Sequence, residues 1–138
     1  MRVLVIDDEP TLLAALRRVL SPGHEVTEAS DGERALELLD AGDFDLILCD
    51  LMLAGLEGVD VFERAVARRP ELEGRFLFMT GGALTPRSVQ FKAELGDRCI
   101  DKPFDARTIS AAVRRFSSTA PTRRLRPRRA ARAGRPPG

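Results

Sequence analysis

The stretch DLILCDLML, residues 45–53, decides the fold of this chain. Its centre, residues 46–49, is a continuous apolar run that ends directly at Asp50. Strands without polar alternation are typical of a parallel sheet that helices cover on both faces. Two more runs of the same kind lie at residues 3–6 and 76–79. The sequence therefore predicts an α/β fold with a buried parallel sheet.

Segments with helical periodicity lie between and after these runs. Their signals are prolines suited to a first turn, capping residues, and apolar stripes at a period of 3.6 residues. They predict five helices, which begin near Pro10, Ser30 (with Glu33 as its capping-box partner), Val59, Thr85 and Asp105.

Two weaker strands are predicted at residues 24–29 and 98–101. The first is partly polar and belongs at an edge of the sheet. Strands and helices then alternate five times, and right-handed crossovers turn this order into a doubly wound, five-stranded sheet. We expect one domain over residues 1–116.

The composition is that of an ordinary soluble domain, with 138 residues, 43% hydrophobic and 31% charged. No apolar run approaches the roughly 20 residues that a membrane-spanning helix needs. The apolar start of the chain leads directly into two acids, which excludes a signal peptide. Cys49 and Cys99 lie within apolar runs and are interpreted as reduced, buried thiols. We therefore expect a cytoplasmic protein.

Residues 117–138 differ from the rest of the chain. They hold seven arginines and no acid, for a net charge of +7, whereas residues 1–116 hold all 21 acids and 15 of the 22 basic residues, for −6. Leu125 is the one large aliphatic residue there, so the segment cannot bury enough apolar surface to offset its ordering entropy. We expect a disordered, solvated tail. It lacks aromatic residues to stack on bases, so nucleic acid is not an expected partner.

Polar side chains follow four of the predicted strands at the points where those strands end. The carboxyl ends of parallel strands meet at one edge of a sheet, where open α/β folds bind ligands. Each side chain alone has an ordinary alternative role in a helix cap, a turn or a solvated surface. Convergence from four strands favours a site instead, formed by Asp7, Asp8, Asp50, Thr80 and Lys102.

This set of residues is suited to phosphoryl chemistry. Three carboxylates repel one another, and a divalent cation relieves that repulsion. Hard oxygen ligands favour Mg²⁺. A carboxylate can act as nucleophile and form an aspartyl phosphate, while a lysine and a threonine neutralise and bind the phosphoryl oxygens. The sequence has no Cys/His metal cluster, no Ser/His/Asp set and no Walker-type loop, and His24 is interpreted as a surface histidine.

The sequence resembles the response regulator receiver family, the chemotaxis-Y-like domains of two-component signalling. The likeness extends from residue 1 to about residue 116. It implies a flavodoxin-like sheet with strand order 2-1-3-4-5 and five helices. The matching stretches are VLVIDDEP at residues 3–10, DLILCDLML at 45–53, FMTG at 78–81 and DKPF at 101–104.

The resemblance assigns roles to individual residues. It implies that Asp50 is the phosphoacceptor. It implies that Asp8 is a direct Mg²⁺ ligand, that Asp7 binds the metal through water, and that Met52 offers its backbone carbonyl to the metal. Gly81 matches the small residue that leaves room for the phosphoryl group.

The resemblance also covers the switching residues. Thr80 matches the switch hydroxyl, Lys102 matches the cation that pairs with the phosphoryl group, and the bond between Lys102 and Pro103 is usually cis in the family. Two positions depart from the family pattern. Cys99 replaces the aromatic ring that rotates on activation, so we do not expect aromatic switching. Ala54 replaces a common proline, which should loosen its loop slightly.

The implied function is acceptance of a phosphoryl group from a sensor histidine kinase or a histidine phosphotransfer protein, with a downstream effector as the next partner. The module has no separate substrate and is not expected to be an enzyme. The alternative is the C-terminal receiver domain of a hybrid sensor kinase, which residues 78–82 resemble. A haloacid-dehalogenase-type phosphatase is disfavoured, because Met52 stands where that chemistry needs an acid. A weak homodimer is left open.

Overall fold

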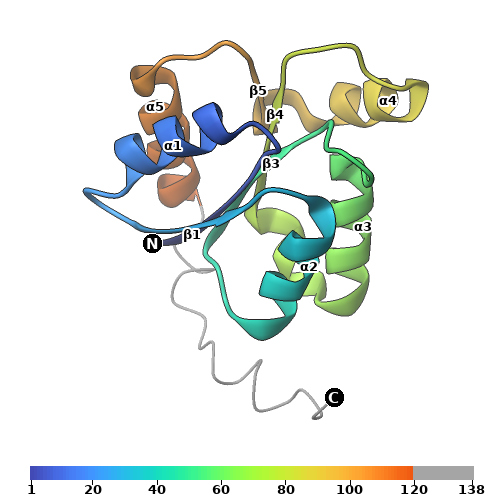
Figure 1. Cartoon of the computed structure of the whole chain (residues 1–138), viewed down its shortest axis with the longest axis horizontal. Helices are drawn as coiled ribbons and strands as arrows, with labels where there is room; N and C mark the ends of the chain where they lie inside the picture. Colours follow the sequence, from blue (N-terminus) through green and yellow to red (C-terminus); the bar gives the residue numbers. More distant parts are fainter. Residues whose placement is uncertain (120–138) are drawn as a thin grey trace.

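The core of the structure is a single sheet of five parallel strands in the order β2-β1-β3-β4-β5 (Figure 1). The structure, a computed structural model, describes residues 1–119. The predicted strand order and the edge position of the second strand are confirmed. The strands are β1 (Arg2–Ile6), β2 (Glu25–Ala29), β3 (Leu46–Asp50), β4 (Phe76–Thr80) and β5 (Cys99–Asp101).

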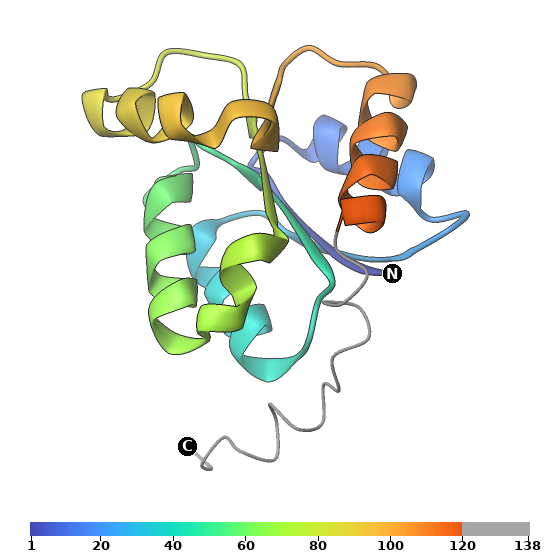
Figure 2. The ribbon, with the colours of Figure 1, turned by 180° about the vertical axis from the view of Figure 1, so that it is seen from behind.

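Helices cover both faces of the sheet. One side carries α1 and α5, the other carries α2 and α3, and α4 lies beside the start of α3 (Figures 1 and 2). The five predicted α-helices are confirmed, and two short 3₁₀ helices are additional. The helices are α1 (Pro10–Leu20), α2 (Gly32–Ala41), α3 (Gly58–Arg68), η1 (Pro70–Arg75), α4 (Pro86–Leu95), η2 (Gly96–Arg98) and α5 (Ala106–Thr119).

The three central strands are buried as their apolar runs predicted. Every residue of β3 and β4 is buried. Along β1, Leu4 and Ile6 pack in the cluster under α2 and α3, whereas Val3 and Val5 pack in the cluster under α1 and α5. Side chains alternate between the faces of a strand, so an uninterrupted apolar run fills both cores.

Two of the predicted helix caps are confirmed and one is wrong. The Thr85 hydroxyl accepts from the Ser88 backbone N–H, and the Asp105 carboxylate accepts from that of Thr108. Ser30 is not the cap of α2. The neighbouring Asp31 has extended backbone and accepts from the Arg34 N–H at 2.8 Å, and a carboxylate is at least as good an N-cap as a hydroxyl.

The last helix extends beyond the predicted domain boundary at residue 116. Helix α5 continues to Thr119, so the first residues of the predicted tail are helical. The rest of that tail, residues 120–138, lies outside the described residues. Within residues 1–119, no helix combines the length and the apolar character needed to cross a membrane.

Candidate functional site

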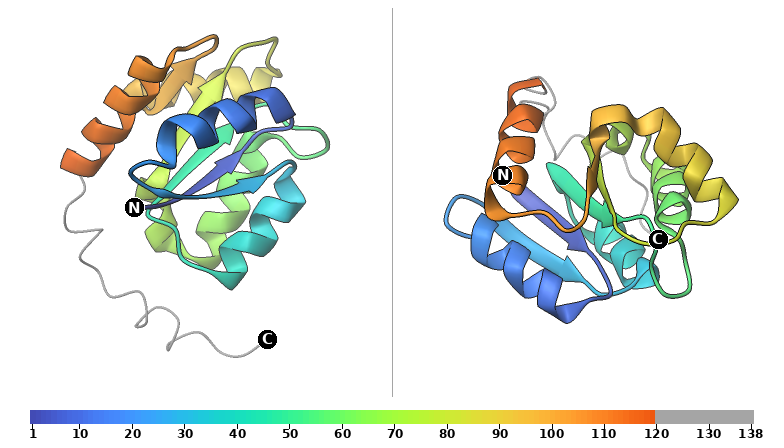
Figure 3. Two further views of the ribbon diagram at one scale, coloured as in Figure 1. Left: turned by 60° about the vertical axis from the view of Figure 1, so that its left-hand side comes forward. Right: turned by 90° about the horizontal axis from the view of Figure 1, so that it is seen from above.

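The predicted site residues lie at the carboxyl edge of the sheet, which the right-hand view of Figure 3 shows from above. Asp7 follows β1, Asp50 is the last residue of β3, Thr80 is the last residue of β4 and Lys102 follows β5. Because these strands are neighbours in a parallel sheet, their ends place the four residues side by side.

Three carboxylates form a cluster at this edge. One oxygen each from Asp7, Asp8 and Asp50 lies within 4.8 Å of the others. Asp7 is fully buried and Asp50 is 5% exposed, whereas Asp8 faces solvent. An all-oxygen donor set open to water on one side fits Mg²⁺, which keeps several waters when protein carboxylates bind it. The backbone N–H of Met52 donates to Asp50 Oδ1 at 3.3 Å, and the role of its carbonyl stays a prediction.

Lys102 provides the positive charge within this cluster. Its Nζ lies 2.8 Å from Asp7 Oδ2 and 3.3 Å from Asp50 Oδ2. It also lies 3.4 Å from Glu9 Oε1, a contact that the sequence analysis did not anticipate. The lysine therefore offsets part of the carboxylate repulsion within the protein itself.

Burial and neighbouring charges change the acidity of the site. Burial, followed by the charge of Asp7, raises the pKa of Asp50 to about 6, against the opposing effect of Lys102. Burial lowers the pKa of Lys102, but its hydrogen bond to Asp7 and the nearby carboxylates outweigh burial, and the pKa is raised overall. At neutral pH Asp50 is therefore mainly ionised and Lys102 is positively charged, as nucleophilic attack on a phosphoryl group requires.

The segments that carry Thr80 and Lys102 are in close contact. The Lys102 N–H donates to the Thr80 carbonyl at 2.6 Å, and the peptide bond between Lys102 and Pro103 is cis as predicted. A Cβ on Gly81 would lie 2.6 Å from the Lys102 Cβ and 3.0 Å from its Cδ. The absence of a side chain at Gly81 thus makes room for the lysine stem, which runs past it towards the carboxylates.

Sequence analysis missed the role of Gly58, the first residue of α3. A Cβ there would lie 2.3 Å from the carbonyl oxygen of Asp50 and 2.8 Å from the Cα of Leu51. The Gly58 N–H also donates to the Leu51 carbonyl at 2.8 Å. Helix α3 therefore begins directly against the backbone of Asp50. A glycine at a helix start was the only signal in the sequence.

The two departures from the family pattern have different surroundings. Ala54 donates its N–H to Asp8 Oδ2 at 3.2 Å, a bond that a proline could not make. Cys99 is half-buried and packs against the core cluster that includes Phe78. Cys49 and Cys99 are free thiols, as predicted. Burial, and next the charge of Asp50, raise the pKa of the Cys49 thiol, which keeps it protonated and unreactive.

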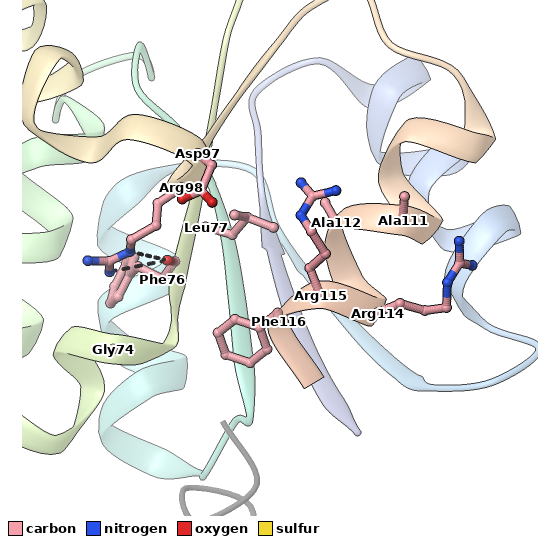
Figure 4. A pocket seen from close by; sticks show the side chains of 10 residues that line it. All are labelled: Gly74, Phe76, Leu77, Asp97, Arg98, Ala111, Ala112, Arg114, Arg115 and Phe116. Atoms are coloured by element: carbon pink, nitrogen blue, oxygen red, sulfur yellow. Dashed lines mark hydrogen bonds between the residues drawn. The ribbon is translucent and has the colours of Figure 1, made fainter. Parts of the chain in front are cut away.

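A pocket of about 550 Å³ lies away from this edge, at the amino end of β4 (Figure 4). Arg98 lines one side of it and donates to the Phe76 carbonyl. It contains one acidic side chain and no cluster of carboxylates, so the candidate site is the carboxyl edge of the sheet instead. The pocket residues are Gly74, Phe76, Leu77, Asp97, Arg98, Ala111, Ala112, Arg114, Arg115 and Phe116.

Two curated relatives match most of this chain in sequence. The transcriptional regulatory protein TcrA of Mycobacterium tuberculosis is 35% identical over 123 residues, which cover 88% of this chain and 47% of that protein. The transcriptional regulatory protein DltR of Streptococcus agalactiae is 35% identical over 115 residues, covering 83% and 50%. The chain thus spans about half the length of the curated relatives that it matches.

Solved structures show the same fold. A response regulator receiver domain protein from Clostridium thermocellum matches with a TM-score of 0.71 at 24% identity, over 86% of this chain and 94% of that one. The family model described as the response regulator receiver domain matches residues 3–114. This chain belongs to the response regulator receiver domain family.

Proposed function

We propose that Asp50 accepts a phosphoryl group from a phosphohistidine, with Mg²⁺ held by Asp7, Asp8 and Asp50. The observation that carries the proposal is the gathering of these three carboxylates within 4.8 Å at the edge that Lys102 also reaches. Mg²⁺, when bound, would neutralise charge on the phosphoryl oxygens.

The chain's own residues have separate roles in this transfer. An oxygen of Asp50 attacks phosphorus, the phosphorus–nitrogen bond of the donor breaks, and an acyl phosphate forms. Lys102, whose Nζ is 3.3 Å from Asp50 Oδ2, is close enough to pair with the new dianion. The hydroxyl of Thr80 would donate a hydrogen bond to the phosphoryl group. This movement of Thr80 would change the conformation of the loop that follows it.

We assign partners on the same basis. The donor is a sensor histidine kinase or a histidine phosphotransfer protein, and the signal passes to a downstream effector. The module acts in the cytoplasm, where the free thiols of Cys49 and Cys99 remain reduced. It changes its own state rather than turning over a separate substrate. The haloacid dehalogenase alternative is not retained, because the chain belongs to the receiver family and Met52 lacks the acid that this alternative needs.

Acetyl phosphate tests the proposal directly. With Mg²⁺ it should convert the native chain to a labile adduct that is heavier by one phosphoryl group and is cleaved by hydroxylamine, as detected by intact-mass spectrometry. Asp50→Asn should form none, whereas the matched control Asp97→Asn, at an exposed position away from the site, should behave as the native chain. An adduct that persists in Asp50→Asn would show that another residue is the acceptor.

A further inference from the structure

A hydrogen-bonded contact joins the start of α3 to the start of α4. Glu57 occupies the N-cap position of α3. Its Oε1 accepts from the Thr85 hydroxyl at 2.7 Å and from the Ser88 hydroxyl at 2.6 Å. Thr85 is the N-cap of α4 and Ser88 lies in its first turn. We call these three side chains the α3–α4 latch.

The chemistry of the latch makes it strong for its size. One carboxylate oxygen receives two short hydrogen bonds, and bonds to an ionised acceptor are stronger than neutral ones. Hydrogen bonds from Ser88 and Thr85 hold the pKa of Glu57 below its ordinary value, so the acceptor is charged at neutral pH. Ser88 is fully buried, and a buried hydroxyl needs such a partner.

Helix α4 has few other attachments to the protein. Within α4 the only buried residues are Ser88 and Leu95. Its first turn is held to α3 mainly by polar groups, since Arg87 also reaches Asp60 at 2.7 Å and Glu63 at 2.8 Å. Both of those ion pairs are exposed, and pairs of that kind contribute little to stability. The latch is therefore the best-shielded polar contact that positions the start of α4.

The latch connects two segments that both begin at the phosphorylation site. On one side, Gly58 follows Glu57 and packs against the Asp50 backbone. On the other side, residues 81–84 lead from Thr80 directly to Thr85. Any movement of Thr80 towards a group on Asp50 displaces the near end of this loop, while the latch fixes its far end.

We propose that Glu57 is a positioning residue that holds the loop of residues 81–85 and the start of α4 in the unphosphorylated conformation. The inference rests on the proposed function, because the opposing force is phosphorylation of Asp50. A contact made in one of two conformations adds its free energy to the gap between them. The latch therefore sets how readily phosphorylation moves α4.

Glu57→Asp separates the latch from the helix cap. Aspartate keeps the negative charge and is a favoured N-cap residue for α3, but it is one methylene too short to reach both hydroxyls. In the metal-free full chain, amide hydrogen exchange at residues 85–89 should quicken by about 3- to 10-fold, which is the worth of a charge-assisted bond at a partly exposed site. Exchange within α3 should not change.

Beryllofluoride, a phosphoryl mimic, then tests the coupling to the site. With Mg²⁺, Glu57→Asp should bind it about 3- to 10-fold more tightly than the native chain, because the unphosphorylated conformation has lost a stabilising contact. Ser88→Ala should shift affinity in the same direction by less, and the double variant should fall short of the sum of the two. Glu94→Gln removes an exposed charge from α4, and this variant should bind beryllofluoride as tightly as the native chain does.

The outcomes are separable. Unchanged exchange at residues 85–89 in Glu57→Asp would overturn the latch. Faster exchange with unchanged beryllofluoride affinity would overturn the coupling and leave Glu57 a purely structural residue. A native chain that fails to bind beryllofluoride would overturn the proposed function and the coupling together, and it would be recognised before any variant is compared.

Discussion

Helices α3 and α4 flank the same edge of the sheet but are attached to the protein in different ways. The backbone of α3 starts against Asp50, and its inner face is apolar. Helix α4 begins at the exposed Pro86, and Val89 on its surface is 54% exposed. The buried residues are Gly58, Val59, Val61 and Ala65 in α3, against Ser88 and Leu95 in α4. The difference indicates that α3 is anchored at the site by its backbone and that α4 is the more weakly attached of the two helices.

One aromatic side chain supplies much of the apolar attachment of α4. The ring centroid of Phe91 lies 5.4 Å from that of Phe62 on α3 and 5.1 Å from that of Phe78 on β4. Cys99 packs against the same cluster. Where the family commonly places a rotating ring, this chain thus has a small thiol, and it packs against the same core cluster as the ring of Phe91 on α4.

The largest expected effect tests how tightly the start of α3 packs against the backbone of Asp50. Gly58→Ala should destabilise the fold by about 3 kcal/mol, because the new methyl group overlaps the Asp50 carbonyl and the helix must shift. Gly82→Ala, in the loop before α4, should change stability by less than about 0.5 kcal/mol, since no atom lies within 4 Å of the added group. Urea unfolding of both variants measures the difference. Similar losses of stability at the two glycines would mean that the start of α3 is packed no more tightly than the loop before α4.

The next effect concerns the acidity of Asp50, the residue against whose backbone α3 starts. A carboxyl group whose pKa rises to about 6 on folding binds more protons in the native state than in the unfolded state between about pH 4 and 6. Stability contributed by this group is therefore lost as the pH rises through that window. Asp50→Asn should stabilise the metal-free protein by about 2 to 3 kcal/mol at pH 7 and by almost nothing below pH 4.

Chemical denaturation at a series of pH values, with a chelator present, measures this profile. Asp97→Asn, which removes an exposed carboxylate away from the site, is the control. A pH-independent difference for Asp50→Asn would mean that burial and Asp7 do not raise the acceptor's pKa.

A smaller effect is expected from metal binding to the carboxylate cluster of Asp7, Asp8 and Asp50. Mg²⁺ at roughly ten times its dissociation constant should stabilise the native chain by about 1 to 2 kcal/mol, because it binds the folded state. Asp8→Ala should lose most of that gain while still folding, since Asp8 is exposed. Thermal melts over a Mg²⁺ titration measure both. A melting temperature that ignores millimolar Mg²⁺ would argue against a metal site at the carboxylate cluster.

The smallest effects should be found around Cys99, and they test whether the conformational change stays in the loop before α4 and the start of that helix. Beryllofluoride with Mg²⁺ should cause large amide shifts from Thr80 to Val89 and small ones at Cys99 and Ile100, because a thiol cannot fill the space that a moving Thr80 vacates. Two-dimensional NMR of the full chain, recorded with and without the mimic, measures the pattern. Shifts at Cys99 as large as those at Thr80 would mean that this position still switches.

Much of the fold could be predicted because its signals are local. Continuous apolar runs marked the three central strands, and Thr85 and Asp105 marked the starts of two helices correctly. The cap of α2 was misplaced by one residue, since Ser30 and Asp31 are both acceptable caps and only backbone geometry separates them. The 3₁₀ helix η1 was missed because a six-residue segment shows no helical period.

The candidate site likewise has residues that the sequence pattern reveals and contacts that it does not reveal. Its polar residues were found because they end strands, which is a position that sequence patterns reveal. The contacts that support them join residues with no pattern in common. Gly58 against Asp50 and Glu57 against Ser88 depend on how two loops pack, and neither spacing nor residue type predicts that packing. The latch therefore became visible only in three dimensions.

The close approach of the Lys102 stem to Gly81 limits which residues these two positions can hold. The chain places a positive charge with arginine 20 times and with lysine twice, yet one of the two lysines is Lys102. The lysine stem passes Gly81 so closely that a Cβ at position 81 would lie 2.6 Å from the Lys102 Cβ, which is too short a contact for any residue with a side chain. A planar guanidinium is not equivalent to a compact ammonium at such a place. Any residue other than glycine at position 81 would therefore require the stem of Lys102 to move, and with it the ammonium group that contacts Asp7 and Asp50.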